Sequence, residues 1–210
     1  MEDSRKIRIL TADDHPLMRE GIEALIAGEP DMTVVSSAAS GREALAQFRA
    51  LRPDVTLMDL QMPDLSGLDA LIAIRAEFPA ARIIVLTTYS GDAQIRQALK
   101  AGASGYLLKS LAHKELLQTI RAVHAGRKSL SPEASFELAE HADLEPLTPA
   151  ELDALQLIAV GNTNKQIADN LGLTEDTVKG RVRNILSKLD AHDRTHAVMI
   201  AIKRGIIRLP

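Results

Sequence analysis

The chain has 210 residues, 46% of them hydrophobic and 25% charged, which is long enough for two small domains and too apolar for a disordered chain. The formal net charge of −3 gives no sign of a nucleic-acid partner, and the absence of cysteine excludes disulfides and thiolate metal sites. The charged first residues and the lack of an apolar run long enough for a bilayer lead us to expect a cytoplasmic protein without membrane contact.

Up to about residue 125 the sequence alternates short β-branched runs with helical patterns, which is typical of a parallel sheet with crossover helices. The predicted strands are Ile7–Thr11, Thr33–Val35, Val55–Met58, Ile83–Thr87 and Gly105–Leu108. The predicted helices cover residues 16–27, 41–51, 67–77, 92–101 and 113–125, with Ser40 as a cap and with Gly102 and Gly126 as stops. This pattern predicts an α/β domain with a doubly wound, five-stranded parallel sheet in the flavodoxin-like order 2-1-3-4-5.

A polar segment with two prolines follows at residues 127–146, and we interpret it as a linker that contains one short helical stretch. From Thr148 the pattern is purely helical, and it begins with a capping box formed by Thr148 and Glu151. The predicted helices cover residues 149–160, 164–171, 175–189 and 194–204. The sequence therefore predicts domains at 1–126 and 147–210, the second an all-α domain of four helices.

Charged and hydroxyl side chains gather at the carboxyl ends of the predicted strands, where parallel sheets bind their ligands. They are Asp13 and Asp14 after the first strand, Asp59 after the third, Thr87 at the end of the fourth and Lys109 after the fifth. Three carboxylates at one edge repel one another unless a cation is present, and hard oxygen ligands suit Mg²⁺. We therefore predict a Mg²⁺ site. None of the six histidines has metal-ligand spacing, so we expect all of them to be structural or surface residues.

These residue types predict phosphoryl transfer. Asp59 can attack a phosphoryl group as a carboxylate nucleophile, while the metal, the Lys109 ammonium and the Thr87 hydroxyl offset charge on its oxygens, and the product is an aspartyl phosphate. As a set, the five residues resemble the receiver domain of two-component response regulators, over roughly residues 5–125.

The resemblance implies further roles in the receiver. The metal is expected on Asp14, Asp59 and the backbone carbonyl of Gln61, with Asp13 acting through water. Thr87 and Tyr106 are expected to form a switch that reads the phosphoryl group. The implied dimer face lies near residues 92–101, 105–108 and 113–125. The implied activity is phosphotransfer to the protein itself with slow autodephosphorylation, so the chain is not expected to be an enzyme.

A second motif lies in the helical domain. Within residues 179–188, four cations stand without an acidic residue, as a footprint on phosphates requires: Lys179, Arg181, Arg183 and Lys188. Gly172 permits a tight turn and Thr174 can cap the next helix, whose inward positions are Val178, Val182, Ile185, Leu186 and Leu189. The tract from Leu147 to Leu189 resembles the LuxR-type helix-turn-helix domain, which together with the receiver resembles the NarL/FixJ family.

This resemblance implies a transcription factor that is switched by phosphorylation. Lys179, Gly180 and Arg183 are expected to face DNA bases, and Lys165 and Thr177 to contact phosphates. The implied partners are a sensor histidine kinase, double-stranded DNA with paired half-sites and, on phosphorylation, a second copy of the chain. RNA polymerase is a further candidate partner.

Two other functions remain open at this point. A phosphatase with an aspartate nucleophile also places Asp at a strand end, but that pattern has a second Asp two residues later, where this chain has Gln61. A receiver used only for protein contacts, with a decayed DNA domain, would fit two departures from the family pattern. These are Gly180 inside the recognition helix and Asp190 in place of a C-cap glycine.

Overall fold

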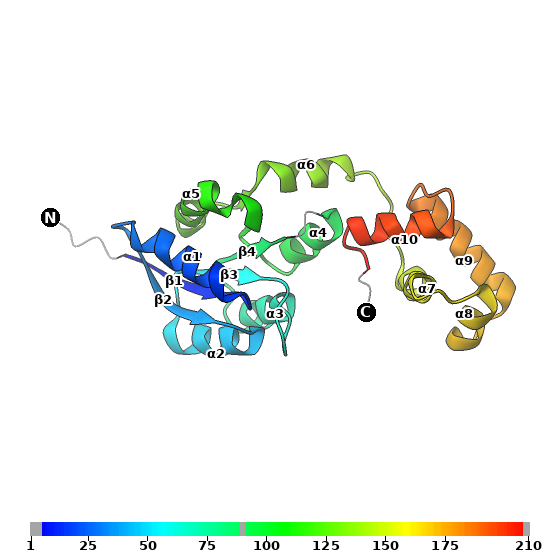
Figure 1. Cartoon of the computed structure of the whole chain (residues 1–210), viewed down its shortest axis with the longest axis horizontal. Helices are drawn as coiled ribbons and strands as arrows, with labels where there is room; N and C mark the ends of the chain where they lie inside the picture. Colours follow the sequence, from blue (N-terminus) through cyan, green and yellow to red (C-terminus); the bar gives the residue numbers. More distant parts are fainter. Residues whose placement is uncertain (1–5, 89–90, 208–210) are drawn as a thin grey trace. The chain divides into compact units, whose positions relative to one another are not determined.

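The computed structural model describes residues 6–88 and 91–207, without the side chains of 111–114. The chain folds as two compact units (Figure 1). Of the described residues, the first unit contains 6–88 and 95–135, and the second contains 91–94 and 136–207. None of the helices in the described ranges combines the length and the apolarity needed to cross a membrane.

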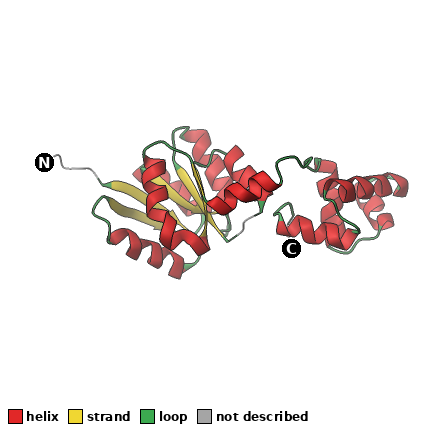
Figure 2. Ribbon diagram, turned by 90° about the horizontal axis from the view of Figure 1, so that it is seen from above, coloured by secondary structure: helices red, strands yellow, loops and turns green. Residues whose placement is uncertain are grey.

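The first unit is built on a parallel sheet in the order β2-β1-β3-β4-β5-β6. Its strands are β1 (Ile7–Ala12), β2 (Met32–Ala38), β3 (Val55–Asp59), β4 (Ile83–Thr87), β5 (Gly105–Leu108) and β6 (Ser129–Leu130). Strands β3 and β4 are buried at every position, because helices cover the sheet on both faces (Figure 2). The doubly wound α/β fold and the order 2-1-3-4-5 are confirmed.

The helices of this unit match the predicted ones to within about two residues. They are α1 (Pro16–Ala27), α2 (Gly41–Leu51), α3 (Gly67–Glu77), α4 (Asp92–Lys100) and α5 (Ala112–His124). Ile26 of α1 and Ile120 of α5 join one core cluster with residues of the central strands, so these two helices share a face of the sheet. Ser40 caps α2 as predicted, since its hydroxyl accepts the Glu43 N–H.

The prediction of five strands is wrong, because β6 pairs with β5 as a sixth strand. Two backbone bonds hold it, from the Ser129 N–H to the Ser104 carbonyl and from the Ser131 N–H to the Tyr106 carbonyl. A two-residue strand inside a polar segment leaves no alternating pattern to detect. Helix α6 (Pro132–Glu140) follows, so the first unit extends past residue 126, where we predicted it to end.

The second unit has the four predicted helices, α7 (Pro149–Ala159), α8 (Asn164–Leu171), α9 (Glu175–Lys188) and α10 (Arg194–Lys203). They enclose a core around Leu155, Ile167 and Ile185. The Thr148–Glu151 capping box opens α7, and the Thr174 hydroxyl caps α9 by accepting the Thr177 N–H. Between α8 and α9 the chain turns at Gly172, whose φ of +65° favours glycine. The helix-turn-helix geometry therefore follows from local signals.

Candidate functional site

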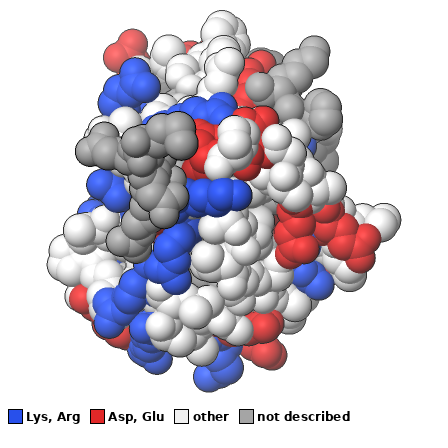
Figure 3. Space-filling view, turned by 90° about the vertical axis from the view of Figure 1, so that its left-hand side faces the viewer, with Lys and Arg blue, Asp and Glu red and all other residues white. Residues whose placement is uncertain are grey.

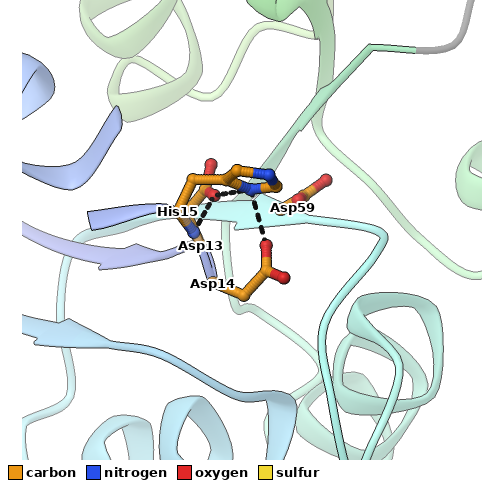
Figure 4. A group of neighbouring side chains, drawn as sticks. All are labelled: Asp13, Asp14, His15 and Asp59. Carbon is orange, nitrogen blue, oxygen red and sulfur yellow. Dashed lines mark hydrogen bonds and ion pairs between the residues drawn. The ribbon is translucent and has the colours of Figure 1, made fainter. Parts of the chain in front are cut away.

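The sheet brings Asp13 and Asp59 side by side. Strands β1 and β3 are neighbours in register, with Ala12 opposite Met58, so the next residue of each strand leaves the sheet at the same edge. Both carboxylates are buried, with 2% and 3% of the residue exposed, whereas Asp14 lies toward solvent. Figure 4 shows these three carboxylates grouped at the ends of their strands.

Lys109 bridges the two buried carboxylates. It follows β5, and its Nζ lies 2.7 Å from Asp13 Oδ2 and 2.8 Å from Asp59 Oδ2. Burial acts to lower the pKa of Lys109, but its hydrogen bonds to the two carboxylates raise the pKa above its usual value. The predicted repulsion is thus offset in part, because this ammonium balances one of the three carboxylate charges.

Asp59 is a carboxylate under opposing influences. Burial raises its pKa and the nearby charge of Asp13 adds to this rise, whereas Lys109 and the Gln61 N–H, 3.2 Å from Asp59 Oδ1, act to lower the pKa. The net direction is upward. The ionised form that a nucleophile needs therefore depends on the cationic groups around it.

Close backbone packing fixes the position of Asp59. Gly67 opens α3 directly beneath it, and a Cβ at Gly67 would lie 1.7 Å from the Asp59 carbonyl oxygen. The Gly67 N–H also donates to the Leu60 carbonyl at 3.1 Å. The role of Gly67 could not be predicted, because a glycine at the start of a helix indicates only a turn.

His15 lies beside the same pocket. It is exposed, as expected of a surface histidine, and it also belongs to a group with Asp13, Asp14 and Asp59 in which one ligand atom of each lies within 4.8 Å of the others. Its Nδ1 lies 2.7 Å from Asp14 Oδ1 and 3.2 Å from Asp13 Oδ1 (Figure 4). The signal was present in the sequence, since His15 directly follows the acidic pair.

Thr87 and Tyr106 lie on neighbouring strands and are both fully buried. Because β6 pairs with β5 at Tyr106, this aromatic side chain lies on an interior strand rather than at the sheet edge. Burial raises the pKa of the Tyr106 phenol, and the charge of Asp59 raises it further. The charge of Asp59 therefore influences the Tyr106 phenol.

The donor set of the pocket fits a hard divalent cation. Carboxylate oxygens are the ligands that Mg²⁺ prefers, and Asp14 lies where water can complete the coordination shell. Asp13 Oδ2 is buried and lies 2.7 Å from the Lys109 ammonium. Three carboxylates against one ammonium leave the cluster negative, which a cation would balance.

In the second unit, α9 presents the predicted DNA-facing positions to solvent. Thr177, Lys179 and Arg183 are exposed on α9, and Lys165 is exposed on α8. A Cβ at Gly180 would meet no atom within 4 Å, so the glycine lies on an open part of the helix surface. These residues are therefore available to a ligand that approaches this helix.

The basic tract is smaller than we predicted. Lys188 points back into the unit, where its Nζ lies 3.0 Å from Glu151 Oε2 and 2.9 Å from Glu145 Oε1. Arg181 donates to the Ala150 carbonyl at 3.4 Å and is half-buried. Of the four cations, Lys179 and Arg183 are the exposed pair, and Lys179 lies 3.1 Å from Asp176. The acidic partners come from outside residues 179–188, so the sequence window did not reveal them.

Both units of the chain resemble domains of known proteins. Residues 9–121 match the model of the response regulator receiver domain, and residues 145–201 match that of the luxR family of bacterial regulatory proteins. The uncharacterized transcriptional regulatory protein YxjL of Bacillus subtilis is 40% identical over 97% of this chain and 98% of its own. The response regulator protein VraR of Staphylococcus aureus is 37% identical over 96% and 99%. A crystal form of the RcsB response regulator of Salmonella typhimurium aligns with a TM-score of 0.74 at 25% identity, covering 92% of this chain and 98% of that one.

Proposed function

The chain belongs to the two-component response regulators that join a receiver domain to a LuxR-type DNA-binding domain, and from this premise we propose that Asp59 is its phosphoacceptor. The chain is a DNA-binding regulator of transcription. The observation that carries the assignment is the convergence of Asp13, Asp59 and Lys109, in which one ammonium bridges two buried carboxylates at adjacent strand ends.

We propose a role for each group in phosphoryl transfer from a phosphohistidine of the sensor kinase. An Asp59 oxygen forms the new O–P bond as the N–P bond breaks, and the electron pair of that bond leaves with the donor imidazole. Lys109 then exchanges a carboxylate contact for a phosphoryl oxygen, because its Nζ lies 2.8 Å from Asp59 Oδ2. Thr87, at the end of β4, supplies a hydroxyl to the same group.

Mg²⁺ fits the remaining charge of the pocket, and when bound it offsets charge on the phosphoryl oxygens. Asp14, Asp59 and the backbone carbonyl of Gln61 are the ligands that we propose, with Asp13 holding an ion-bound water. We propose no activity on other phosphoesters. The second carboxylate that a phosphatase needs as its acid and base is replaced by Gln61.

For the second unit we propose that phosphorylation promotes dimerisation, and that the dimer binds paired half-sites through two α9 helices. Lys179, Gly180 and Arg183 then face the bases, and Lys165 and Thr177 contact phosphates. The exposure of these side chains on α8 and α9 supports the assignment. Each recognition helix reads one half-site, so a dimer doubles the contact.

Labelling with a small phosphodonor such as acetyl phosphate, in the presence of Mg²⁺, tests the phosphoacceptor. We expect an acid-labile phosphoryl group on the wild-type chain and none on the Asp59→Asn variant. Asp64→Asn is a matched control, because Asp64 is exposed in the loop after β3 and its substitution removes the same charge nearby. Full labelling of Asp59→Asn, or loss of label from Asp64→Asn alone, would overturn the assignment.

A further inference from the structure

Arg19, near the start of α1, reaches back to the main chain of the acidic pocket. Its guanidinium Nη1 donates a hydrogen bond to the backbone carbonyl of Asp13 at 2.6 Å, and the residue is half-buried. The Arg19 N–H in turn donates to the His15 carbonyl at 3.3 Å. A hydrogen bond from a charged donor is stronger than one between neutral groups. Arg19 therefore ties the helix that follows the pocket to the strand that precedes it.

The carbonyl that Arg19 binds lies just beyond the end of the sheet. Ala12 is the last residue of β1 that pairs with β2 and β3. The N–H of Asp13 still reaches the Ala38 carbonyl, at 3.1 Å, but the Asp13 carbonyl has passed the last paired position. A backbone carbonyl at such a point needs a partner from another part of the fold, and Arg19 provides it. Both ends of the Asp13 main chain are thus held, one by the sheet and the other by α1.

The consequence falls on Asp14. The Asp13 carbonyl and the Asp14 N–H belong to one planar peptide group, so the bond from Arg19 restricts the rotation of that plane. The plane sets the direction in which the Asp14 side chain leaves the backbone. The Asp13 carboxylate is held by Lys109 at 2.7 Å, whereas Asp14 contacts the ring of His15, which is itself 69% exposed. The position of the Asp14 carboxylate at the end of β1 (Figure 4) therefore depends mainly on its backbone.

We propose that Arg19 is a positioning residue for the metal ligand Asp14. By holding the peptide between Asp13 and Asp14, it directs the Asp14 carboxylate toward the pocket before the ion arrives, and so raises the affinity for Mg²⁺. A ligand that is already in place loses less freedom on binding, and groups that orient metal ligands affect metal affinity without touching the ion. This inference rests on the proposed function, because Asp14 is a ligand that we propose there. It concerns the affinity of the metal site and not the nucleophile.

Titration of the unphosphorylated full chain with Mg²⁺, followed by its amide resonances, tests the proposal. Arg19→Met keeps the length of the side chain but removes the donor, and we expect it to bind Mg²⁺ about tenfold more weakly than wild type. Arg19→Lys keeps a charged donor for this single hydrogen bond and should stay within about threefold of wild type. Arg127→Met is the matched control and should bind as wild type, because Arg127 is exposed between α5 and β6, at the edge of the sheet opposite the pocket.

Salt separates the hydrogen bond from the charge of Arg19. Between about 0.1 M and about 1 M KCl the screening length falls from about 10 Å to about 3 Å, so an effect of charge alone shrinks. The ratio of Mg²⁺ affinities between wild type and Arg19→Met should instead stay constant, because it depends on the position of the peptide. A ratio that returned to one at high salt would contradict positioning.

Labelling by acetyl phosphate over a range of Mg²⁺ concentrations separates positioning from damage to the fold. In Arg19→Met the concentration for half-maximal rate should rise about tenfold, while the rate at saturating Mg²⁺ stays within about twofold of wild type, since Asp59 and Lys109 keep their contact. Unchanged Mg²⁺ affinity in Arg19→Met, or the same loss in Arg127→Met, would overturn the role of Arg19 and leave the phosphorylation site standing. If Asp59→Asn bound Mg²⁺ as tightly as wild type, the proposed metal site itself would fail instead.

Discussion

Thr87 and Tyr106 connect the pocket to the rest of the receiver through two adjacent strands. Both are fully buried, and burial, together with the charge of Asp59, raises the pKa of the Tyr106 phenol. If a phosphoryl oxygen draws the Thr87 hydroxyl inward, the space beside it becomes available to the aromatic ring. We therefore propose that the signal passes from phosphorylated Asp59 to Thr87 and then to Tyr106.

Thr87→Ala is expected to preserve phosphorylation of Asp59 but to weaken the effect of phosphorylation on dimerisation and DNA affinity. Asp59 should still accept the phosphoryl group, since its own oxygen and Lys109 remain. The gain in dimerisation and DNA affinity on phosphorylation should fall about fivefold or more, because the coupling between the sites is lost. Thr87→Ser keeps the hydroxyl and should behave as wild type in sedimentation and DNA titration. An unchanged gain in Thr87→Ala would show that the signal takes another route.

For Gly180, a role in DNA binding can be separated from an effect on the stability of the second unit. A glycine inside a helix costs about 1 kcal/mol relative to alanine, and a Cβ here meets nothing within 4 Å. We therefore expect Gly180→Ala to raise the free energy of unfolding of the second unit by about that amount. If the helix backbone approaches DNA closely, the same change should weaken binding to operator DNA selected from a random pool. Equal or tighter binding would indicate that Gly180 plays no part in recognition.

Helix α7 depends on Glu151, which serves both as the capping-box partner of Thr148 and as an ion-pair partner of Lys188. Its Oε2 accepts the Thr148 N–H at 2.8 Å and lies 3.0 Å from Lys188 Nζ. Burial acts to raise the pKa of Glu151, but the Thr148 N–H and the Lys188 ammonium outweigh it and hold the pKa below its usual value. A carboxyl group with a lowered pKa stabilises the fold above its unfolded pKa, and this stability is lost as pH falls through the folded value.

Glu151→Gln tests this contribution. Glutamine preserves the capping box, because its amide oxygen can still accept the Thr148 N–H, but it removes the charge that faces Lys188. At neutral pH we expect the variant to be less stable than wild type by about 1 kcal/mol, and the difference to shrink below about pH 4.5. Chemical denaturation over this pH range measures it. A difference that stays constant with pH would show that the charge does not contribute.

The elements that the sequence predicts well are those with local signals. Ser40, Thr148 and Thr174 are caps whose partners lie three residues away, so the helix starts can be read directly from the sequence. Strand β6 was not predicted, because two residues are too few to show an alternating pattern of hydrophobic residues. Its formation depends on backbone hydrogen bonds to Ser104 and Tyr106. Such bonds are set by the tertiary fold.

Local signals and tertiary contacts also differ in how well they allow the site residues to be predicted. The pocket carboxylates could be predicted because parallel strands end at one edge, which is a property of the topology. The role of Lys188 could not, since its acidic partners lie 37 and 43 residues earlier in the chain and the apparent basic tract hid them. His15 was not predicted as a pocket residue although it directly follows Asp13 and Asp14, because the histidines were expected to lack metal-ligand spacing to any acidic or histidine partner.

For the whole molecule, net charge says little about DNA. The chain is formally −3, and on the face drawn in Figure 3 both Lys or Arg and Asp or Glu side chains occur. Binding to a polyanion must therefore depend on a few exposed cations of the second unit. Lys165 and Arg183 are the exposed cations for which we propose different roles, the first at phosphates and the second at bases.

A pair of alanine variants can separate these roles in the phosphorylated dimer. Each phosphate that a cation neutralises steepens the fall of log K with log salt by about 0.9, so Lys165→Ala should flatten that slope by about 1.8 per dimer and weaken binding to every sequence alike. Arg183→Ala should instead cost about 1–3 kcal/mol at particular base pairs and relax preference there. Lys203→Ala, an exposed lysine at the end of α10, controls for loss of one positive charge. Titrations of operator and scrambled duplexes over a range of salt measure all three. Equal losses for Arg183→Ala on both duplexes would mean that Arg183 contacts the backbone and that sequence is read by other residues of α9.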